Sequence, residues 1–182
     1  MEKRTNNVQN ILTKESIFTA LMILMEKKDF KEISITEITK KAGVSRMAFY
    51  RNYDEKEDII GTYLEELFEE YSKEILSCSI SDDNNNIENL RLYFSYFRKH
   101  EKLISNLIKS NLINMLLEKC IDSLYTLSME TSCDRSYSPE KQSFWIEYMA
   151  GGLYTVLIKW AKGGMKESDE HMAEVISEFI HN

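Results

Sequence analysis

The sequence predicts an all-α protein: a small N-terminal helical unit is joined by a long helix to a larger C-terminal helical part, with about nine helices in total. Three observations support this prediction. The 182 residues include one proline and six glycines, so little interrupts a helix. Apolar residues recur with the 3.6-residue helical period along most of the chain. Residues typical of helix starts and helix ends punctuate that pattern.

Composition and charge favour a soluble globular chain, with 29% charged and 43% hydrophobic residues. The net charge of −7 is unevenly divided, since residues 1–58 carry +1 and the remainder −8. The longest apolar run near the start is too short to span a bilayer. The three cysteines and three histidines lack the spacing of a metal site or a disulfide framework. We therefore expect a cytoplasmic protein with no membrane association, no metal and no cofactor.

A first helix is expected over about residues 12–28, after a polar arm that we expect to fray. Its inward face is marked by apolar residues at helical spacing, which are Ile17, Ala20, Leu21, Leu24 and Met25. Residues 31–35 alternate like a strand, but the run is short and isolated, so we interpret it as a loop. The first helix should support the helices that follow it.

A short second helix is predicted over residues 35–42. Ser34 and Glu37 have the spacing of a capping box, in which each side chain bonds a backbone N–H near the other residue. Gly43 should end this helix, because the chain must reverse through a positive φ that glycine tolerates best. Val44 is the apolar residue of the turn.

A third helix should follow at once, from residue 46 to about residue 52. Ser45 is its N-cap and Phe49 faces inward, which leaves most of its other side chains exposed. Residues 38–53 contain four Lys or Arg and no Asp or Glu. A helix, a glycine turn and a second short helix are how a helix-turn-helix places a recognition helix in the major groove of DNA. The alternative is a small helical bundle whose turn needs glycine for geometry only.

Residues 33–59, ISITEITKKAGVSRMAFYRNYDEKEDI, resemble the N-terminal DNA-binding domain of TetR-family transcriptional regulators. The resemblance implies a DNA-binding domain over residues 10–70 and an effector-binding and dimerisation domain over residues 71–182. Met47 stands where the family often has glycine or another small residue, and Ala48 where it often has a phosphate-contacting threonine. The DNA-binding positions that the resemblance implies are Thr36, Ser45, Arg46, Met47, Ala48, Tyr50, Arg51, Asn52 and Lys56.

Roles follow from position in the motif. Arg46, Met47 and Asn52 are expected to meet bases or groove edges, with Arg46 forking onto guanine and Met47 against a thymine methyl group. The positions expected to contact base or phosphate are Thr36, Tyr50, Arg51 and Lys56.

The fourth helix should start near Asp54 and Glu57, which repeat the capping-box spacing, and run to about residue 78. Later helices are expected at about residues 87–98, 101–108, 112–129, 139–162 and 168–181, with loops at 79–86 and 131–138. Ser138 and Pro139 read as the N-cap and first residue of one of these helices, and Gly163 ends it.

The last two helices are amphipathic, so we expect them to form a four-helix bundle with a second copy of the chain. Such a homodimer would place two recognition helices about 34–36 Å apart on a palindromic operator. The alternative is packing within one chain. Residues 145–168 also resemble the C-terminal region of a TetR subgroup that includes co-activators. The residues expected at the dimer interface are Leu153, Val156, Leu157, Trp160, Met172, Ile176, Phe179 and Ile180.

Aromatic residues and methionines are frequent in the C-terminal part, and in the family such residues line a pocket for a small-molecule effector. The alternative is that they form ordinary core. The pocket residues that we expect are Phe94, Phe97, Tyr125, Trp145, Tyr148 and Met149.

The leading hypothesis is a sequence-specific DNA-binding regulator, a ligand-responsive dimeric repressor of the TetR family. The second hypothesis is a TetR-like co-activator or interaction protein that engages DNA only with a partner protein, which the missing threonine at Ala48 favours. An enzyme is not expected, because the sequence has no nucleophile elbow, glycine-rich phosphate loop or paired-carboxylate motif.

Overall fold

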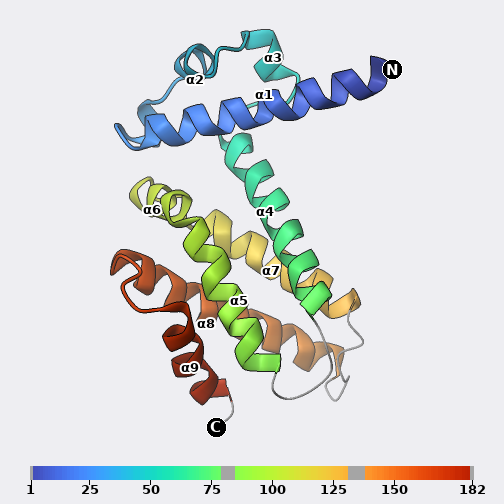
Figure 1. The fold of residues 1–182 in the computed structure, drawn as a ribbon, viewed down its shortest axis with the longest axis vertical. Coiled ribbons are helices and arrows are strands. Elements are labelled where there is room, and N and C mark those ends of the chain that lie inside the picture. The colour runs from blue at the N-terminus through green and yellow to red at the C-terminus, as the bar shows by residue number, and fades with distance from the viewer. Residues whose placement is uncertain (1, 79–84, 131–137, 181–182) are drawn as a thin grey trace.

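The computed structural model describes residues 2–78, 85–130 and 138–180. These residues form nine α-helices and one short 3-10 turn, with no strand among them, which confirms the predicted all-α fold. In Figure 1, α1 lies across one end of the molecule beside α2 and α3, α4 leads away from them, and α5 to α9 pack together beyond. The elements are α1 (Glu2–Met25), η1 (Phe30–Glu32), α2 (Ile35–Ala42), α3 (Arg46–Tyr50), α4 (Glu57–Cys78), α5 (Asn85–Lys99), α6 (Glu101–Lys109), α7 (Asn114–Glu130), α8 (Pro139–Lys162) and α9 (Asp169–Ile180).

α1 begins at Glu2 instead of near residue 12. The added residues are polar, but they include no glycine or proline, so nothing in their backbone stops a helix. At its other end α1 stops at Met25, three residues early, where Lys27 N donates to Leu24 O at 3.0 Å and tightens the last turn. Most of the predicted apolar stripe is buried, namely Ile17, Ala20, Leu21 and Met25.

α4 connects the two parts of the molecule, packing on α1 with its first turns and on α5 and α7 further along. It begins at Glu57, and the structure uses a different cap from the predicted one. The carboxylate of Asp58 accepts the backbone N–H groups of Asp54 and Glu55, each at 2.9 Å. The prediction chose the wrong acid because Glu57 and Asp58 both stand at plausible capping positions.

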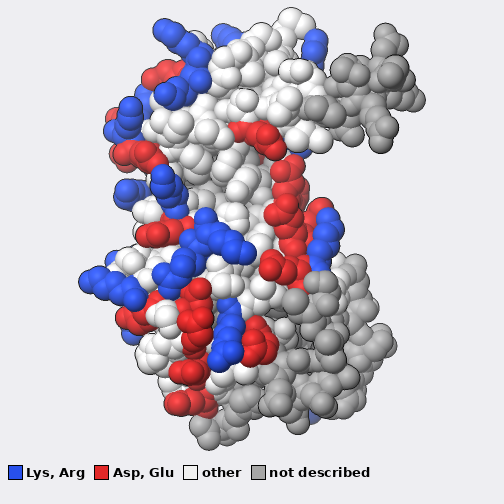
Figure 2. Space-filling model, viewed as in Figure 1, with Lys and Arg blue, Asp and Glu red and all other residues white. Residues whose placement is uncertain are grey.

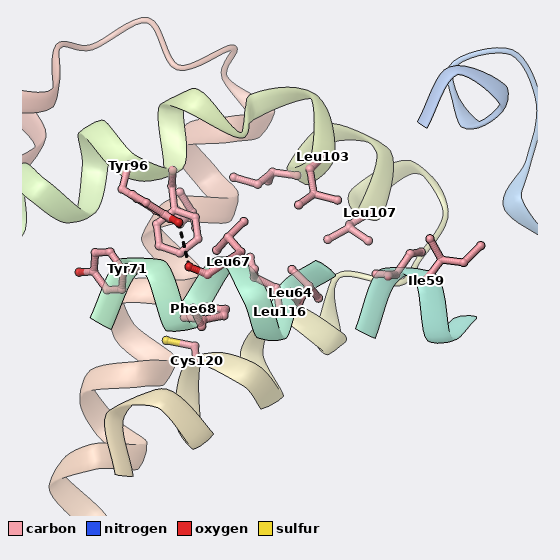
Figure 3. Close-up of a cluster of buried hydrophobic side chains, with 14 of the residues drawn as sticks. Ile59, Leu64, Leu67, Phe68, Tyr71, Tyr96, Leu103, Leu107, Leu116 and Cys120 are labelled. Atoms are coloured by element: carbon pink, nitrogen blue, oxygen red, sulfur yellow. Dashed lines mark hydrogen bonds between the residues drawn. The ribbon is translucent and has the colours of Figure 1, made fainter. Parts of the chain in front are cut away.

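The core beyond α1 is built largely from rings. Tyr93 and Phe97 of α5 have centroids 4.8 Å apart, and Tyr71 of α4 lies 5.1 Å from Tyr96. The buried Tyr96 hydroxyl donates to the Leu67 carbonyl oxygen at 2.8 Å (Figure 3). Apolar side chains of α6 and α7 continue this cluster along α4 toward its start, as Figure 3 shows for Leu103, Leu107, Leu116, Cys120 and Ile59.

α8 begins and ends as predicted, with the Ser138 hydroxyl accepting the Lys141 N–H and Gly163 at the C-cap. The bounds of α5, α6 and α7 lie within two residues of the predicted ones. The predicted loops over 79–86 and 131–138, with Cys133, lie largely outside the described residues. Within the described parts of the chain, no helix combines the length and apolar character that crossing a bilayer requires.

α9 turns back onto α5, and Arg98 of α5 holds the connection that makes this possible. Its guanidinium donates to the Asp169 carboxylate at 2.6 Å and to the carbonyl oxygens of Met165 at 2.7 Å and Glu167 at 2.5 Å. The same group lies 4.6 Å from the ring centroid of Trp160 in α8. One side chain therefore joins α5, α8, the connecting turn and α9.

Candidate nucleic-acid interface

The start of α2 is fixed by the predicted capping box. The Ser34 hydroxyl accepts the Glu37 N–H at 3.3 Å, and the Glu37 carboxylate accepts the Ser34 N–H at 3.0 Å. Lys28, just after α1, donates to the same carboxylate at 2.5 Å. The Lys28 bond and then the two bonds from Ser34 lower the pKa of Glu37 to about 2. These contacts join the end of α1 to the beginning of α2.

The turn between α2 and α3 has the predicted geometry. Gly43 has a φ of +69°, in the left-handed region, and the Val44 N–H returns to the Thr39 carbonyl oxygen at 3.0 Å. The Ser45 hydroxyl then accepts the Ala48 N–H at 3.1 Å as the N-cap of α3. Phe49 is fully buried and so anchors α3 against the core.

The opposite face of α3 is exposed, with Met47 at 69% and Tyr50 at 47% of their full exposure. The Arg46 guanidinium donates to the Tyr50 hydroxyl at 3.4 Å and lies 5.9 Å from the centre of that ring. Arg51 is exposed at the end of the helix. A long planar cation, an aromatic hydroxyl and a flexible apolar side chain therefore project together from a short helix, as major-groove reading requires.

Basic side chains surround this face. Thr36, Lys40 and Lys41 of α2 are exposed. Figure 2 shows Lys and Arg at the end of the molecule formed by α2 and α3, and a line of Asp and Glu along α4. Residues 38–53 carry four Lys or Arg and no acid, so α2 and α3 themselves attract phosphates. Carboxylates begin just beyond the end of α3, where Asp54 and Asp58 share a hollow with Arg51.

Three of the predicted DNA-binding side chains form hydrogen bonds with the protein's own main chain. Ser45 caps α3, as described above. Asn52 is half-buried, and its amide donates to the Ala48 carbonyl oxygen at 2.9 Å, which closes the end of α3. Lys56 is half-buried, and its ammonium donates to main-chain carbonyl oxygens of the η1 region. The structure thus leaves Thr36, Arg46, Met47, Tyr50 and Arg51 exposed and without a capping role.

α1 also contributes to this surface, which sequence reasoning missed. Gln9, Asn10 and Thr13 line a crevice of about 270 Å³ together with Arg51 and Asn52 of the α3 end. No local sequence signal marks these residues, because the sequence of a polar helical segment cannot be distinguished from that of a polar tail. The crevice places neutral hydrogen-bonding groups beside an exposed arginine.

The six expected effector-pocket residues differ widely in exposure, and none of them lines a hollow described below, so the effector pocket stays a prediction. Phe94 and Phe97 are buried in the ring core, where Phe94 lies 5.4 Å from Trp160. Trp145 and Tyr148 project into solvent from α8. Tyr125 is half-buried with its hydroxyl 2.7 Å from that of Ser143, and Met149 is half-buried. Aromatic content does not distinguish core, surface and pocket positions.

Hollows border α4 instead. One of about 560 Å³ lies between α1 and α4 and is lined by Phe18, Tyr63 and Glu66, with His100 from the start of α6. Burial lowers the pKa of His100. A second, of about 370 Å³, lies between α4 and α7 beside Phe68 and Ser123.

Two of the eight residues expected at the dimer interface cannot lie there. Leu157 and Trp160 are buried inside the protomer, at 1% and 3% exposure, so a partner cannot reach them. The hydrophobic stripe of α8 marks the face that packs on the chain's own core. Five others are partly buried against that core, Leu153, Val156, Met172, Ile176 and Ile180. Phe179 is exposed.

A different face of α8 is exposed and apolar. Phe144 and Tyr148 are exposed at 71% and 75%, with Trp145 between them. They stand one helical turn apart and so form one surface. We call Phe144, Trp145 and Tyr148 the aromatic face of α8.

Comparison with known proteins covers both parts of the chain. The family described as "Bacterial regulatory proteins, tetR family" matches residues 17–62, and that described as "Transcriptional regulator C-terminal region" matches residues 84–182. A curated relative, the uncharacterized HTH-type transcriptional regulator YxbF of Bacillus subtilis (strain 168), is 34% identical over 56 residues. That stretch is 30% of this chain and only 15% of YxbF.

Solved structures show the same fold. The dihydroxyacetone kinase operon activator DhaS matches with a TM-score of 0.63 and 21% identity, over 93% of this chain and 94% of DhaS. Lin0861 from Listeria innocua matches with a TM-score of 0.76 and 19% identity, over 96% of this chain and 92% of the other. With a matched C-terminal family over more than half its length and a matched helix-turn-helix family before it, the chain belongs to the TetR family of transcriptional regulators, which are DNA-binding proteins and not enzymes.

Proposed function

We propose that this protein is a dimeric, ligand-responsive repressor that acts in the cytoplasm and reads its operator with α3. The observation that carries the proposal is the exposed face of α3, where Arg46, Tyr50 and Arg51 project from a stretch, residues 38–53, that contains no Asp or Glu. Arg46 suits guanine and Met47 a thymine methyl group. We expect Thr36 and Arg51, which are exposed, to meet phosphates on either side.

Dimerisation supports this proposal through the aromatic face of α8. Three large exposed aromatics on one helix are costly in a monomer, and a second copy would cover them by an isologous contact. Gly151 and Gly152 follow on the same helix, with open space where a Cβ would stand, so a neighbouring helix could approach closely there. Two copies of α3 would then bind the half-sites of a palindromic operator.

Effector control would act through α4. The hollow between α4 and α7 is polar at Ser72 and Ser123, whose hydroxyls lie 3.0 Å apart, and apolar at Phe68. A small molecule bound there would favour one position of α4, and α4 leads directly to the end of α3.

The test is fluorescence anisotropy on the DNA upstream of the protein's own gene. We expect tight binding that weakens steeply with salt. Tyr50→Ala should weaken it by about 1–3 kcal/mol, or roughly 5- to 150-fold, because a groove contact is lost. The circular-dichroism spectrum of Tyr50→Ala should match that of the wild type. Lys102→Ala, which changes an exposed residue of α6, serves as the control and should bind normally. A Tyr50→Ala protein that binds like the wild type would refute this contact assignment.

A second candidate is a co-activator or interaction protein that meets DNA only with a partner. The similar structure DhaS is described as an operon activator, and Ala48 lacks a phosphate-binding hydroxyl. Wild-type protein that binds no upstream DNA alone, but binds it after addition of a protein captured by cross-linking, would favour this candidate over the repressor.

A further inference from the structure

Lys56 stands in the turn before α4, where family position implies a phosphate contact. Its Nζ lies 2.7 Å from the Phe30 carbonyl oxygen, 3.0 Å from that of Ile33 and 3.2 Å from that of Lys31. The Nζ also lies 4.5 Å from the centroid of the Phe30 ring, which is buried. An ammonium group has three N–H donors and here it has three acceptors and a ring face. Its hydrogen-bonding capacity is filled within the protein.

The surroundings of Lys56 also oppose a phosphate. Asp54, Glu55, Glu57 and Asp58 flank it on both sides in the sequence. The Asp58 carboxylate accepts the N–H groups of Asp54 and Glu55, so these two donors are not available to a ligand. Four acidic residues within two positions of Lys56 give this turn a negative charge, which disfavours the approach of an anion.

We propose that Lys56 is a positioning residue that ties the turn at residues 30–33 to the start of α4, and that it does not bind DNA phosphate. That turn leads straight into Ser34, the cap of α2. The other end of the helix-turn-helix reaches α4 through residues 51–56 of the chain itself. Residues 34–50 are therefore attached to the start of α4 at both ends.

This double attachment would couple both ends of the helix-turn-helix to a movement at the start of α4. With the Lys56 tie broken, α4 would remain joined to α3 by the chain and would still pack on α1, but the turn that leads into α2 would lose its direct link to the start of α4. The inference therefore rests on the proposed function and names the residue that would transmit an effector signal to both helices.

The experiment compares Lys56→Met and Lys56→Arg with the wild type in operator anisotropy between about 50 and 200 mM salt. It is run at a temperature at which circular dichroism shows all three fully folded. For Lys56→Met we expect about tenfold weaker binding at every salt concentration, with the slope of log K against log salt unchanged. Lys56→Arg should restore most of the affinity, since a guanidinium also donates to several carbonyl oxygens.

Two results would overturn the proposal. A phosphate contact would make the slope of Lys56→Met shallower by about 0.9 per subunit. Normal affinity in Lys56→Met would show that the tie positions nothing. Arg51→Met is the matched control, since an exposed arginine on the same surface should reduce the slope by that amount.

Amide hydrogen exchange separates failure of this inference from failure of the proposed function. If wild-type protein binds no operator, the proposed function fails, and the tie is judged by exchange alone. Lys56→Met should then speed exchange in α2 and leave α7 unchanged. Equal exchange in α2 of both proteins would contradict the tie, with or without DNA.

Discussion

Glu37 links α1 to the helix-turn-helix by accepting hydrogen bonds from Lys28 and from both donors of Ser34. These bonds require the ionised carboxylate, and they hold its pKa at about 2. A group whose pKa is lowered on folding contributes stability above its unfolded pKa, and this contribution is lost as the pH falls toward the folded value. Protonation of Glu37 at low pH should therefore weaken the link between the end of α1 and the start of α2.

Glu37→Gln should lower the midpoint of thermal unfolding at neutral pH, because the neutral amide loses the bond to Lys28. The difference from the wild type should persist down to about pH 4.5 and shrink between there and about pH 2, where the wild-type carboxylate is protonated too. Thermal unfolding followed by circular dichroism across this range measures it. Glu118→Gln, an exposed glutamate of α7, should show no comparable pH-dependent difference.

The turn between α2 and α3 depends on a residue in the left-handed region of backbone conformation. Gly43 is at a φ of +69°, and a Cβ added there would meet no atom within 4 Å. The cost of a side chain at this position is therefore conformational and not steric crowding by neighbours.

Gly43→Ala should destabilise the protein by about 1–2 kcal/mol, the cost of a left-handed residue with a Cβ. Gly61→Ala is the matched control, and it should change the free energy of unfolding in the opposite direction. Gly61 lies inside α4, where a Cβ would make an ordinary 3.9 Å contact with Met115, so alanine should stabilise by about 0.5–1 kcal/mol. Urea unfolding of the three proteins measures both changes, and equal effects of the two substitutions would contradict the conformational argument.

The elements that the sequence predicted best are those with local signals at their ends. Ser34, Gly43, Ser45 and Pro139 each act within a few residues, so their effect is visible without knowing the fold. The start of α1 was missed because a helix without a stop signal simply continues. The partners of Lys56 were missed for the opposite reason, since its three acceptors lie 23 to 26 residues away in the sequence.

The candidate sites show the same limit. Exposure of α3 followed from the inward position of Phe49, and the structure agrees. The dimer and effector residues could not be separated by periodicity, because an apolar stripe shows only that a face is buried. Trp160 is covered by its own chain, whereas Tyr148, which belongs to no such stripe, is exposed.

At the scale of the whole molecule, the basic residues 38–53 and the aromatic face of α8 lie in different parts of the protein. Figure 2 shows Lys and Arg at the α2 and α3 end, a line of Asp and Glu along α4, and further Lys and Arg mixed with Asp and Glu over the helices beyond. The aromatic face of α8 belongs to the opposite part of the molecule, so it is free to meet a second copy without competing with DNA.

Tyr148→Glu should convert the proposed dimer into a monomer, because it places an unpaired charge within an apolar contact. Light scattering after size-exclusion chromatography measures the mass. Leu12→Glu makes a similar apolar-to-acid change at an exposed site of α1 and should leave the mass unchanged. A dimer that survives Tyr148→Glu would show that the subunits meet through another surface.

The return of α9 onto α5 bears on how such dimers behave over time. Arg98 holds the connection between α8 and α9 against its own chain, and this disfavours domain swapping of α9 between subunits. When a dimer dissociates, each protomer would keep its own α9 and would not need to unfold. Differently tagged populations mixed in solution should therefore form hybrid pairs at the rate of simple dissociation, and old and newly made copies in a cell would share one common pool.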